Sequence, residues 1–529
     1  MKPMKKRVPL RLFSLFLCVL LLLSFLAACN TAEIPPEEES DTDPANSTEK
    51  QTQAASEAET ESDTAEEPTQ TEEPEKEPTP FSSDFYVGYA IADISPDAPV
   101  PLSGYGNELN TRISFQTPGH RLYATCVAVK SDESVALLYN LDLIGLSGDL
   151  LESVQAGIQK QTGIPRENIL INCSHSHSAP SYALADYPAI STWRTFFYTK
   201  MVNLALDSVA DLEKAEAYTG STHVENMNFV RRYLLKDGTY DTVSSVSDDV
   251  ASHETQADDE LQIILFKRQS KQPVLMVNWR AHPCMMGSTP IVSGDYISEF
   301  RKQMEEQGYL FAFHQGAAGN VTTFSAIRDE YTHNHKANLR WYGEVLTNAV
   351  METIPKLKLT NTDMLQASAK TLTMQIDHTT DHLASVAKEI YGLWCDTTNP
   401  DSQKRYQELC KQYDIPSAYA ASAIVARYEM AQTQEITVYA LSFGDIAFAT
   451  APFEIFQETG IFIKENAPYQ MTFASGYTNG AYGYLPASHA FPHHGYEVDT
   501  CKYVRGSAEI IADTLLELLD QQKLARENS

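Results

Sequence analysis

Residues 134–178 read SVALLYNLDLIGLSGDLLESVQAGIQKQTGIPRENILINCSHSHS. The apolar run Ser134–Leu143 predicts a strand. Within Asp149–Thr162 the leucine, valine and isoleucine residues recur at helical spacing, and a Gly-Ile-Pro sequence follows, so a helix is predicted there. Asn168–Cys173 predicts the next strand. A strand–helix–strand unit of this kind is typical of an α/β fold.

The alternation of strands and helices continues through the rest of the chain. Further strands are predicted at Gln272–Trp279, Tyr309–Phe313, Ile436–Phe443, Ile446–Thr450 and Gln470–Ala474. Further helices are predicted at Ile297–Glu306, Leu339–Ile354, Thr380–Leu393, Ser402–Tyr413 and Ala418–Gln434. We therefore expect one large α/β domain over residues 81–529, with mixed sheets, flanking helices and a metal site formed by strand-end loops.

Residues 1–29 are predicted to be a lipoprotein signal peptide. Five Lys and Arg residues precede the apolar run Leu12–Leu26, and Leu-Ala-Ala-Cys29 follows. A short apolar segment that ends in small residues is a cleaved secretory signal rather than a spanning helix. The last four residues resemble a lipobox, so a lipidated Cys29 would hold the protein at the extracytoplasmic face of the cell membrane. The alternative is an ordinary signal peptide with an incidental cysteine.

Residues 30–80 are predicted to be a disordered acidic tether. They contain 17 Asp and Glu residues against Lys50 and Lys76, and Ile34 is their only large apolar residue. Of the formal net charge of −30, the signal carries +5 and the tether −15, which leaves −20 on residues 81–529. A domain this acidic is not expected to bind nucleic acid, because phosphate contacts require clustered Lys and Arg.

Potential ligands follow directly after several predicted strands. His175 and His177 follow one strand, His282 a second, Glu454 a third, and Tyr484 lies in the loop after a fourth. Ligand crevices of α/β sheets lie beyond the carboxyl ends of strands, and two or three histidines with a carboxylate suit zinc. Each residue also has a structural interpretation: surface polarity for the His-Ser-His segment, a core histidine, a helix cap for the glutamate and a core tyrosine.

Other catalytic motifs are absent or incomplete. No H-E-x-x-H and no G-x-S-x-G sequence occurs, which argues against a helix-borne zinc site and a nucleophile elbow. Six cysteines beyond Cys18 and Cys29 lack C-x-x-C spacing, and their pairing stays open. The loop from Gln315 to Asn320 is glycine-rich but lacks the Walker lysine. We expect Gly316, Gly319 and Asn320 to approach a substrate or metal closely.

Several motifs together resemble the catalytic domain of the neutral/alkaline non-lysosomal ceramidases, over Val87 to about Leu518. They are, in the family's order, Gly88–Pro96 (GYAIADISP), Ser103-Gly104-Tyr105, His120–Ala124 (HRLYA) and Ser174–Pro180 (SHSHSAP). The resemblance implies that the metal is zinc and that its ligands are His175 in the H-x-H loop, His282 in the H-P element, Glu454 after the proline, and Tyr484.

The same resemblance implies a catalytic set beside the metal. His177, the second histidine of the loop, would assist proton movement or oxyanion binding. Tyr496 matches a tyrosine twelve residues after the ligand tyrosine, in a Tyr-Glu pair. Arg231 best matches the family's turn arginine, with Arg232 as a nearby rival.

Two departures from the family concern the substrate. The ceramidases carry a loop serine with a catalytic role, whereas the equivalent loop here, Gly316–Asn320, has no serine. The chain also ends soon after the last predicted helix, so no C-terminal immunoglobulin-like domain is expected.

We therefore predict a zinc-dependent hydrolase that cleaves an amide bond, in ceramide or another N-acylated lipid, at the outer face of the membrane. The metal would lower the pKa of bound water and polarise the carbonyl group. The alternative is a non-enzymatic surface binding protein built on a retired hydrolase fold, because fold does not imply function. The missing serine favours this alternative, and the intact ligand set argues against it.

The lipobox interpretation predicts that Cys29→Ser releases the protein from membranes, since the acylated cysteine would supply the anchoring methylenes. Fractionation of cells that express each form, followed by immunoblotting, measures the release. Continued recovery of the Cys29→Ser protein in the membrane fraction would contradict the interpretation.

Overall fold

The computed structural model describes residues 84–105, 113–114, 119–328 and 336–529. The predicted signal peptide, Cys29 and the predicted tether lie outside these residues. A nine-stranded mixed sheet runs through the domain in the order β12-β11-β10-β5-β1-β2-β3-β4, with β14 also paired to β5. Its strands are β1 (Phe85–Asp93), β2 (Tyr123–Ser131), β3 (Ser134–Leu141), β4 (Ile169–Cys173), β5 (Glu213–His223), β10 (Glu260–Arg268), β11 (Val274–Trp279), β12 (Leu310–Gln315) and β14 (Lys358–Thr360).

A second, four-stranded sheet packs face to face on the first. Its order is β15-β16-β17-β19, with β15 (Leu365–Gln375), β16 (Thr433–Phe443), β17 (Ile446–Thr450) and β19 (Met471–Ser475). Large apolar side chains from both sheets form one buried cluster, in which the rings of Phe85 and Phe443 stack at 5.4 Å. Burial of these side chains between the sheets is a main stabilising contribution to the domain.

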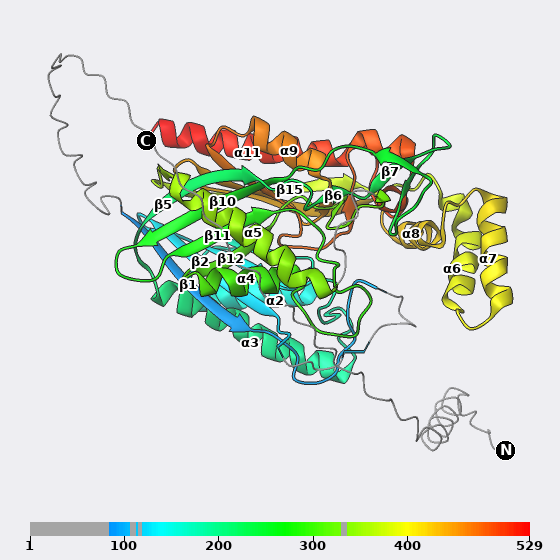
Figure 1. Cartoon of the computed structure of the whole chain (residues 1–529), viewed down its shortest axis with the longest axis horizontal. Helices are drawn as coiled ribbons and strands as arrows, with labels where there is room; N and C mark the ends of the chain where they lie inside the picture. The colour runs from blue at the N-terminus through cyan, green and yellow to red at the C-terminus, as the bar shows by residue number, and fades with distance from the viewer. Residues whose placement is uncertain (1–83, 106–112, 115–118, 329–335) are drawn as a thin grey trace, which may run out of the picture. The chain divides into compact units, whose positions relative to one another are not determined.

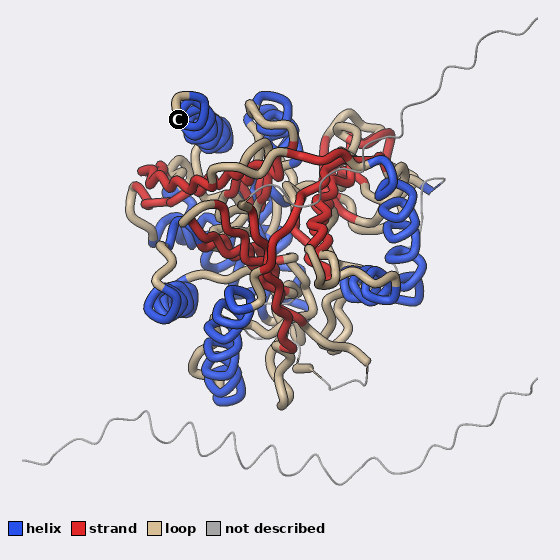
Figure 2. The backbone as a smooth tube through the Cα atoms, turned by 90° about the vertical axis from the view of Figure 1, so that its left-hand side faces the viewer, coloured by secondary structure: helices blue, strands red, loops and turns tan. Residues whose placement is uncertain are grey.

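Helices cover the outer faces of both sheets (Figures 1 and 2). On the large sheet, α2 (Gly148–Thr162) and α3 (Pro188–Ala210) pack on one part, and α4 (Tyr296–Glu306) and α5 (Leu339–Thr353) pack on another. On the smaller sheet, α9 (Gln457–Asn466) and α11 (Ser507–Glu527) form the cover. The arrangement is a four-layer α/β/β/α sandwich, which confirms the predicted α/β class.

Smaller elements lie outside the sandwich. The helices α6 (Ala384–Cys395), α7 (Pro400–Tyr413) and α8 (Ala418–Glu429) form a cluster with its own core. A three-stranded sheet combines β7 (Arg232–Leu235), β8 (Tyr240–Thr242) and β9 (Val250–His253). Two short pairs join β6 (Phe229–Val230) to β13 (Val321–Thr322) and β18 (Glu454–Ile455) to β20 (Tyr484–Leu485). Among the described residues, no helix is long and apolar enough to span a membrane.

Most predicted elements occur with ends that shift by a few residues. The exception is the helix predicted over Ala418–Gln434: α8 ends at Glu429, because Met430 adopts an extended conformation, and β16 begins at Thr433. Sequence periodicity also missed α3, the 23-residue helix that covers β1 and β2. Its apolar residues are distributed around the helix, so no single amphipathic face marks it.

Asn172, near the end of β4, ties three strand ends together. Its side-chain nitrogen donates to the carbonyl oxygens of Gln315 (3.3 Å) and Gly476 (3.0 Å) and to the Thr478 hydroxyl (3.0 Å). Its side-chain oxygen accepts a hydrogen bond from the Gln315 backbone nitrogen at 2.8 Å. The side chain is fully buried, so these bonds have no competition from water.

We expect Asn172→Ala to lower the free energy of unfolding by about 2–4 kcal/mol, because buried backbone groups of Gln315 and Gly476 would lose their partners. Urea unfolding followed by circular dichroism measures the change. Asn528→Ala at the exposed end of the chain is the matched control and should cost little. Equal stability of the two variants would contradict the role given to Asn172.

Candidate metal and catalytic site

The His-Ser-His loop leaves the end of β4 through a strained residue. The backbone nitrogens of Ser174 and His175 bond to the carbonyl oxygens of Leu141 (2.8 Å) and Leu143 (2.9 Å). These bonds hold His175 at φ 68°, in the left-handed region that non-glycine residues seldom adopt. The loop is thereby turned so that His175 and His177 both face the centre of the site.

The other predicted ligands come from three separate segments. His282 follows β11, and a bridge pairs it with Thr322 of β13. Glu454 and Tyr484 are direct neighbours, because β18 and β20 pair in parallel at these two residues. The structure thus brings His175, His282, Glu454 and Tyr484 close together, and their role as ligands stays a prediction.

The ligand atoms of the three histidines converge. One nitrogen from each of His175, His177 and His282 lies within 4.8 Å of the others. Glu454 Oε2 lies 3.2 Å from His175 Nε2 and 3.4 Å from His282 Nε2. The Tyr484 ring stacks over the His282 ring at 6.5 Å.

Each histidine is oriented by a backbone carbonyl. The Nδ1 atoms of His175, His177 and His282 contact the carbonyl oxygens of Ile144 (2.7 Å), Gly104 (3.2 Å) and Val321 (3.0 Å), respectively. An imidazole that donates through Nδ1 presents Nε2 as a lone-pair donor, which is the usual second contact of a metal-binding histidine.

The surroundings of the buried polar atoms show whether these histidines and Glu454 are suited to bind a metal. His282 Nε2 and Glu454 Oε2 are fully buried, and apart from the contacts of Glu454 Oε2 with the two imidazoles neither atom has a polar partner of good hydrogen-bond geometry among the described residues. Such atoms are costly unless an ion or water satisfies them. Two or three imidazole nitrogens with one carboxylate oxygen are a zinc-type donor set, so the residues present fit the metal.

The charges of the site also suit a cation. Burial, reinforced by Arg231, lowers the pKa of His282 to about 4. Burial opposes ionisation of Glu454, but His175 and His282 outweigh it and hold the pKa of this carboxyl well below its usual range. At neutral pH the site therefore combines a neutral His282 with an ionised Glu454, which are the protonation states that bind metal.

Arg231 connects Tyr484, a predicted metal ligand, to a buried carboxylate. Its guanidinium donates to the Tyr484 hydroxyl at 2.8 Å, to the Gly319 carbonyl at 3.1 Å and to Glu497 Oε1 at 2.7 Å. Arg232 pairs with Glu254 at 2.6 Å and also reaches Glu497 at 3.4 Å, but unlike Arg231 it does not line the cavity beside the histidines. The structure therefore places Arg231, and not its rival, at the site.

Glu497 is a functional candidate that sequence reasoning did not select. It is fully buried, and it accepts hydrogen bonds from Arg231 and from the Thr242 hydroxyl at 2.6 Å. Arg231 and Arg232 outweigh burial and lower its pKa. Its position next to Tyr496 in the Tyr-Glu pair was the only sequence signal.

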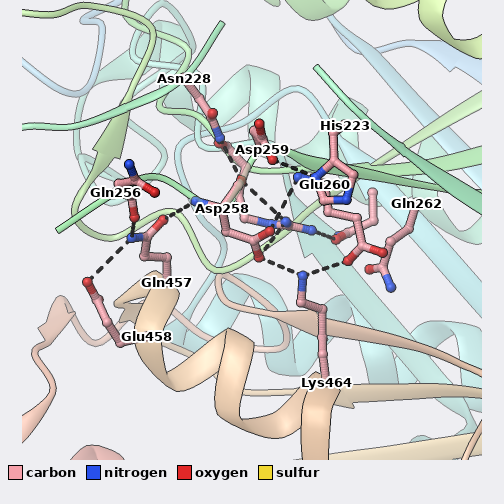
Figure 3. Close-up of polar contacts among 12 residues, drawn as sticks. His223, Asn228, Gln256, Asp258, Asp259, Glu260, Gln262, Gln457, Glu458 and Lys464 are labelled. Carbon is pink, nitrogen blue, oxygen red and sulfur yellow. Dashed lines mark hydrogen bonds and ion pairs between the residues drawn. The ribbon is translucent and has the colours of Figure 1, made fainter. Parts of the chain in front are cut away.

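A polar network fixes the segments behind Glu454 and His282 (Figure 3). Asp258 pairs with Lys464 of α9 at 2.6 Å and with Arg280 at 2.6 Å, and Lys464 also reaches Glu260 at 2.8 Å. Arg280 lies two residues before His282, and α9 begins three residues after Glu454. The network therefore holds both ligand-bearing segments on the same framework.

The glycine-rich loop lies against this framework. The Gly319 nitrogen donates to the Ile455 carbonyl at 2.9 Å, and a Cβ atom at Gly319 would come within 2.4 Å of the Glu454 carbonyl oxygen. Asn320 accepts from the Gln457 nitrogen and donates to Glu458, both at 2.9 Å. A Cβ at Gly316 would press on Arg280 and Asn278 at 3.2 Å. The loop supports the Glu454 segment, and its direct contact with substrate stays a prediction.

A cavity of 730 Å³ opens beside the histidines. His177, Arg231, Tyr484 and Tyr496 all line it, so the predicted catalytic residues share one space with a predicted metal ligand. Many of the other lining residues come from β8 and the turn after it, from the segment around α10 (Tyr496–Asp499) and from the start of α8, and the rest are Gly104, Tyr105, Cys284, Gly287, Thr322 and Phe324.

Comparisons with known proteins give a structural match. No family model matches the chain, and no curated protein matches its sequence. The neutral ceramidase from Pseudomonas aeruginosa superimposes with a TM-score of 0.61 at 14% identity, over 84% of this chain and 75% of that one. A ceramidase complexed with C2 gives a TM-score of 0.62 at 15% identity, over 84% and 76%. The chain has the neutral ceramidase fold.

Within this ceramidase fold, Tyr477 is a further residue that sequence reasoning did not assign to the site. Its ring lies 4.3 Å from the His175 ring, and its backbone has φ 54°. Its hydroxyl is buried without a hydrogen-bond partner among the described residues. The only sequence signal was its place directly after β19, in the loop that leads to Tyr484.

We expect the purified protein to hold about one zinc ion per chain. His175→Ala or His282→Ala should lose most of this zinc, because either change removes a ligand and leaves the set of ligands incomplete. Elemental analysis after dialysis measures occupancy. His382→Ala, at an exposed histidine far along the chain, is the control. Full occupancy in the His175→Ala/His282→Ala double variant would refute the site.

Proposed function

We propose that the protein is a zinc-dependent hydrolase of an amide bond. The observation that carries the proposal is the convergence of two buried histidines, the half-buried His177 and Glu454 beside a cavity, in a chain with the neutral ceramidase fold. The names of the structural neighbours make ceramide, or another N-acylated lipid, the first substrate class to test.

The metal would be held by His175, His282, Glu454 and Tyr484, and when bound it would supply activated water and a Lewis acid for the amide carbonyl. Glu454 contributes the charge that makes the donor set selective for a cation. The carbonyl contacts of the histidines hold the rings in place before any ligand arrives, which removes an entropic cost of assembling the site.

The chain's own groups supply the acid–base steps. Burial lowers the pKa of His177 well below its usual value, so this imidazole is neutral and can accept a proton in the cavity. Arg231 and Tyr496 line the same space, and Arg231 is fixed by Glu497. These donors would stabilise the negative charge that develops on the carbonyl oxygen, and His177 would return its proton to the leaving amine.

No serine nucleophile is needed in this scheme. The loop that lacks the family's serine packs on the Glu454 backbone, where Gly319 makes a close approach that a side chain would prevent. The loss of the serine therefore leaves the metal ligands and the proton carrier intact. This geometry favours an enzyme over the alternative of a surface binding protein on a retired hydrolase fold.

We also propose that the hydrolase acts at the extracytoplasmic face of the cell membrane. The support is the sequence before the domain: a cationic, apolar segment that ends at Leu-Ala-Ala-Cys29, and an acidic stretch that separates it from residue 84.

We expect His177→Ala to retain zinc and to lower kcat by about a hundredfold or more, the usual effect of losing an acid–base group. The rate at which the free amine is released from a short-chain ceramide in detergent gives kcat, and elemental analysis gives the zinc content. His382→Ala again serves as the control. Loss of zinc in His177→Ala, together with full zinc and activity in Tyr484→Phe, would show that His177 is the ligand and Tyr484 is not.

A further inference from the structure

A row of aromatic rings leads from the metal ligands out to the helical cluster. Tyr484, stacked over His282, meets Tyr496 edge to face at 5.4 Å, and Tyr496 meets Tyr419 of α8 at 5.2 Å. Tyr419 in turn contacts Trp394 of α6 at 5.0 Å, and Trp394 contacts Tyr391 at 5.8 Å. Nothing in the proposed hydrolytic scheme requires the outer half of this row.

Two cavities lie along the row and meet at Tyr419. The first is the 730 Å³ cavity beside the histidines, which Tyr484, Tyr496 and Tyr419 line. The second has a volume of 530 Å³ and is lined by Trp394, Tyr406 and again Tyr419. Pro416, Ser417 and Tyr419 belong to the walls of both, so the two cavities adjoin, and together they are called here the aromatic groove.

The lining of the aromatic groove offers an alkyl chain little aliphatic surface, because its apolar area comes mainly from aromatic rings. Val243 is the one branched aliphatic side chain among the described residues that line the first cavity, and Ile415 is the one in the second. The remaining lining residues are mostly tyrosines and residues with hydroxyl, carboxylate, amide or imidazole groups. Alkyl chains gain free energy from burial against aliphatic surface, whereas polar lining groups would lose hydration without a hydrogen bond in return.

The charges around the groove also disfavour a membrane lipid. Asp241 and Asp499 line the first cavity beside Arg231, which Glu497 neutralises, and Asp414 lines the second beside Lys411. Residues 81–529 carry a net charge of −20. Bacterial lipid surfaces rich in anionic headgroups would repel such a face at distances within a Debye length.

We propose that the aromatic groove binds an oligosaccharide that contains N-acylated amino sugars, with one N-acyl group at the metal site. Aromatic faces carry partial negative charge, and the C–H face of a pyranose ring carries partial positive charge, so the two stack. The hydroxyl and carboxylate groups of Tyr419, Ser417 and Asp499 offer hydrogen bonds to sugar hydroxyls. The choice of an N-acylated sugar rests on the amide hydrolysis proposed above.

Hydrolysis of such a substrate balances without a further reactant. Water adds its oxygen to the acyl carbon, the carbon–nitrogen bond breaks, and the products are a carboxylate and an amino sugar that takes up the proton.

Binding of N-acetylglucosamine oligomers of one to six units, measured by calorimetry on the full chain in detergent, tests the proposal. Affinity should rise at least tenfold from the monomer to the tetramer, because a longer chain reaches Tyr419 and Trp394. Trp394→Ala and Tyr419→Ala should each remove most of this gain. The control is Tyr428→Ala, which removes an exposed tyrosine of α8 that lines neither cavity.

The measurement is repeated with His282→Ala, so that binding is read without hydrolysis. Length-dependent binding in this variant supports the groove even if the wild-type protein releases no acetate, in which case the hydrolase proposal fails alone. Absence of oligomer binding together with hydrolysis of a short-chain ceramide overturns the groove proposal and leaves the hydrolase standing. Unchanged length dependence in both alanine variants also overturns it. Circular dichroism checks folding, and Tyr419→Leu replaces Tyr419→Ala if that variant does not fold.

Discussion

The contact of one carboxylate with two histidines is the constraint around which the site is built. Glu454 Oε2 lies 3.2 Å and 3.4 Å from the two imidazoles, in a position that water scarcely reaches. A buried carboxylate is unstable unless positive charge or hydrogen bonds compensate for its lost hydration. The surrounding structure therefore has to keep three chain segments in fixed positions, and the features behind the site do this: the bonds of Asn172, the pairing of β18 with β20, and the ion pairs of Asp258.

The sequence indicated which residues lie at the site better than it indicated which strands bring them together. His175, His282 and Glu454 could be found because each follows an apolar strand, and that rule needs no knowledge of which strands are neighbours. The strands concerned belong to different sheets, however, and the pairing of Glu454 with Tyr484 involves only two residues on each side. A pair this short leaves no periodic pattern to detect, so the sequence motifs of the resemblance supplied Tyr484.

Contacts with distant parts of the chain decided the residues that sequence analysis left open or overlooked. Arg231 and Arg232 are adjacent and chemically identical, yet alternation along the chain sends one to Tyr484 and the other to Glu254. Glu497 was overlooked because an acidic residue beside a tyrosine has no distinctive spacing. Its role depends on two arginines and a threonine that are more than 250 residues away in the sequence. The helix α3 escaped notice for a different reason, since its apolar residues occur on all sides.

The candidate metal ligands and the walls of the cavity come from different parts of the fold. This difference matters for which substrates a protein with this fold can accept. The candidate metal ligands follow strands of the sandwich or lie on short strands bonded to it, so their positions depend on the buried core. Much of the cavity wall comes from β8 and the turn after it, from the residues around α10 and from the start of α8, all outside the two main sheets, and a smaller part comes from segments close to His282, such as Cys284 and Thr322. Changes in these outer elements alter the shape and polarity of the cavity without moving His175, His282 or Glu454. A chain 14–15% identical to the ceramidases can therefore keep a complete metal-type donor set while a row of tyrosines and acidic groups lines the path to it.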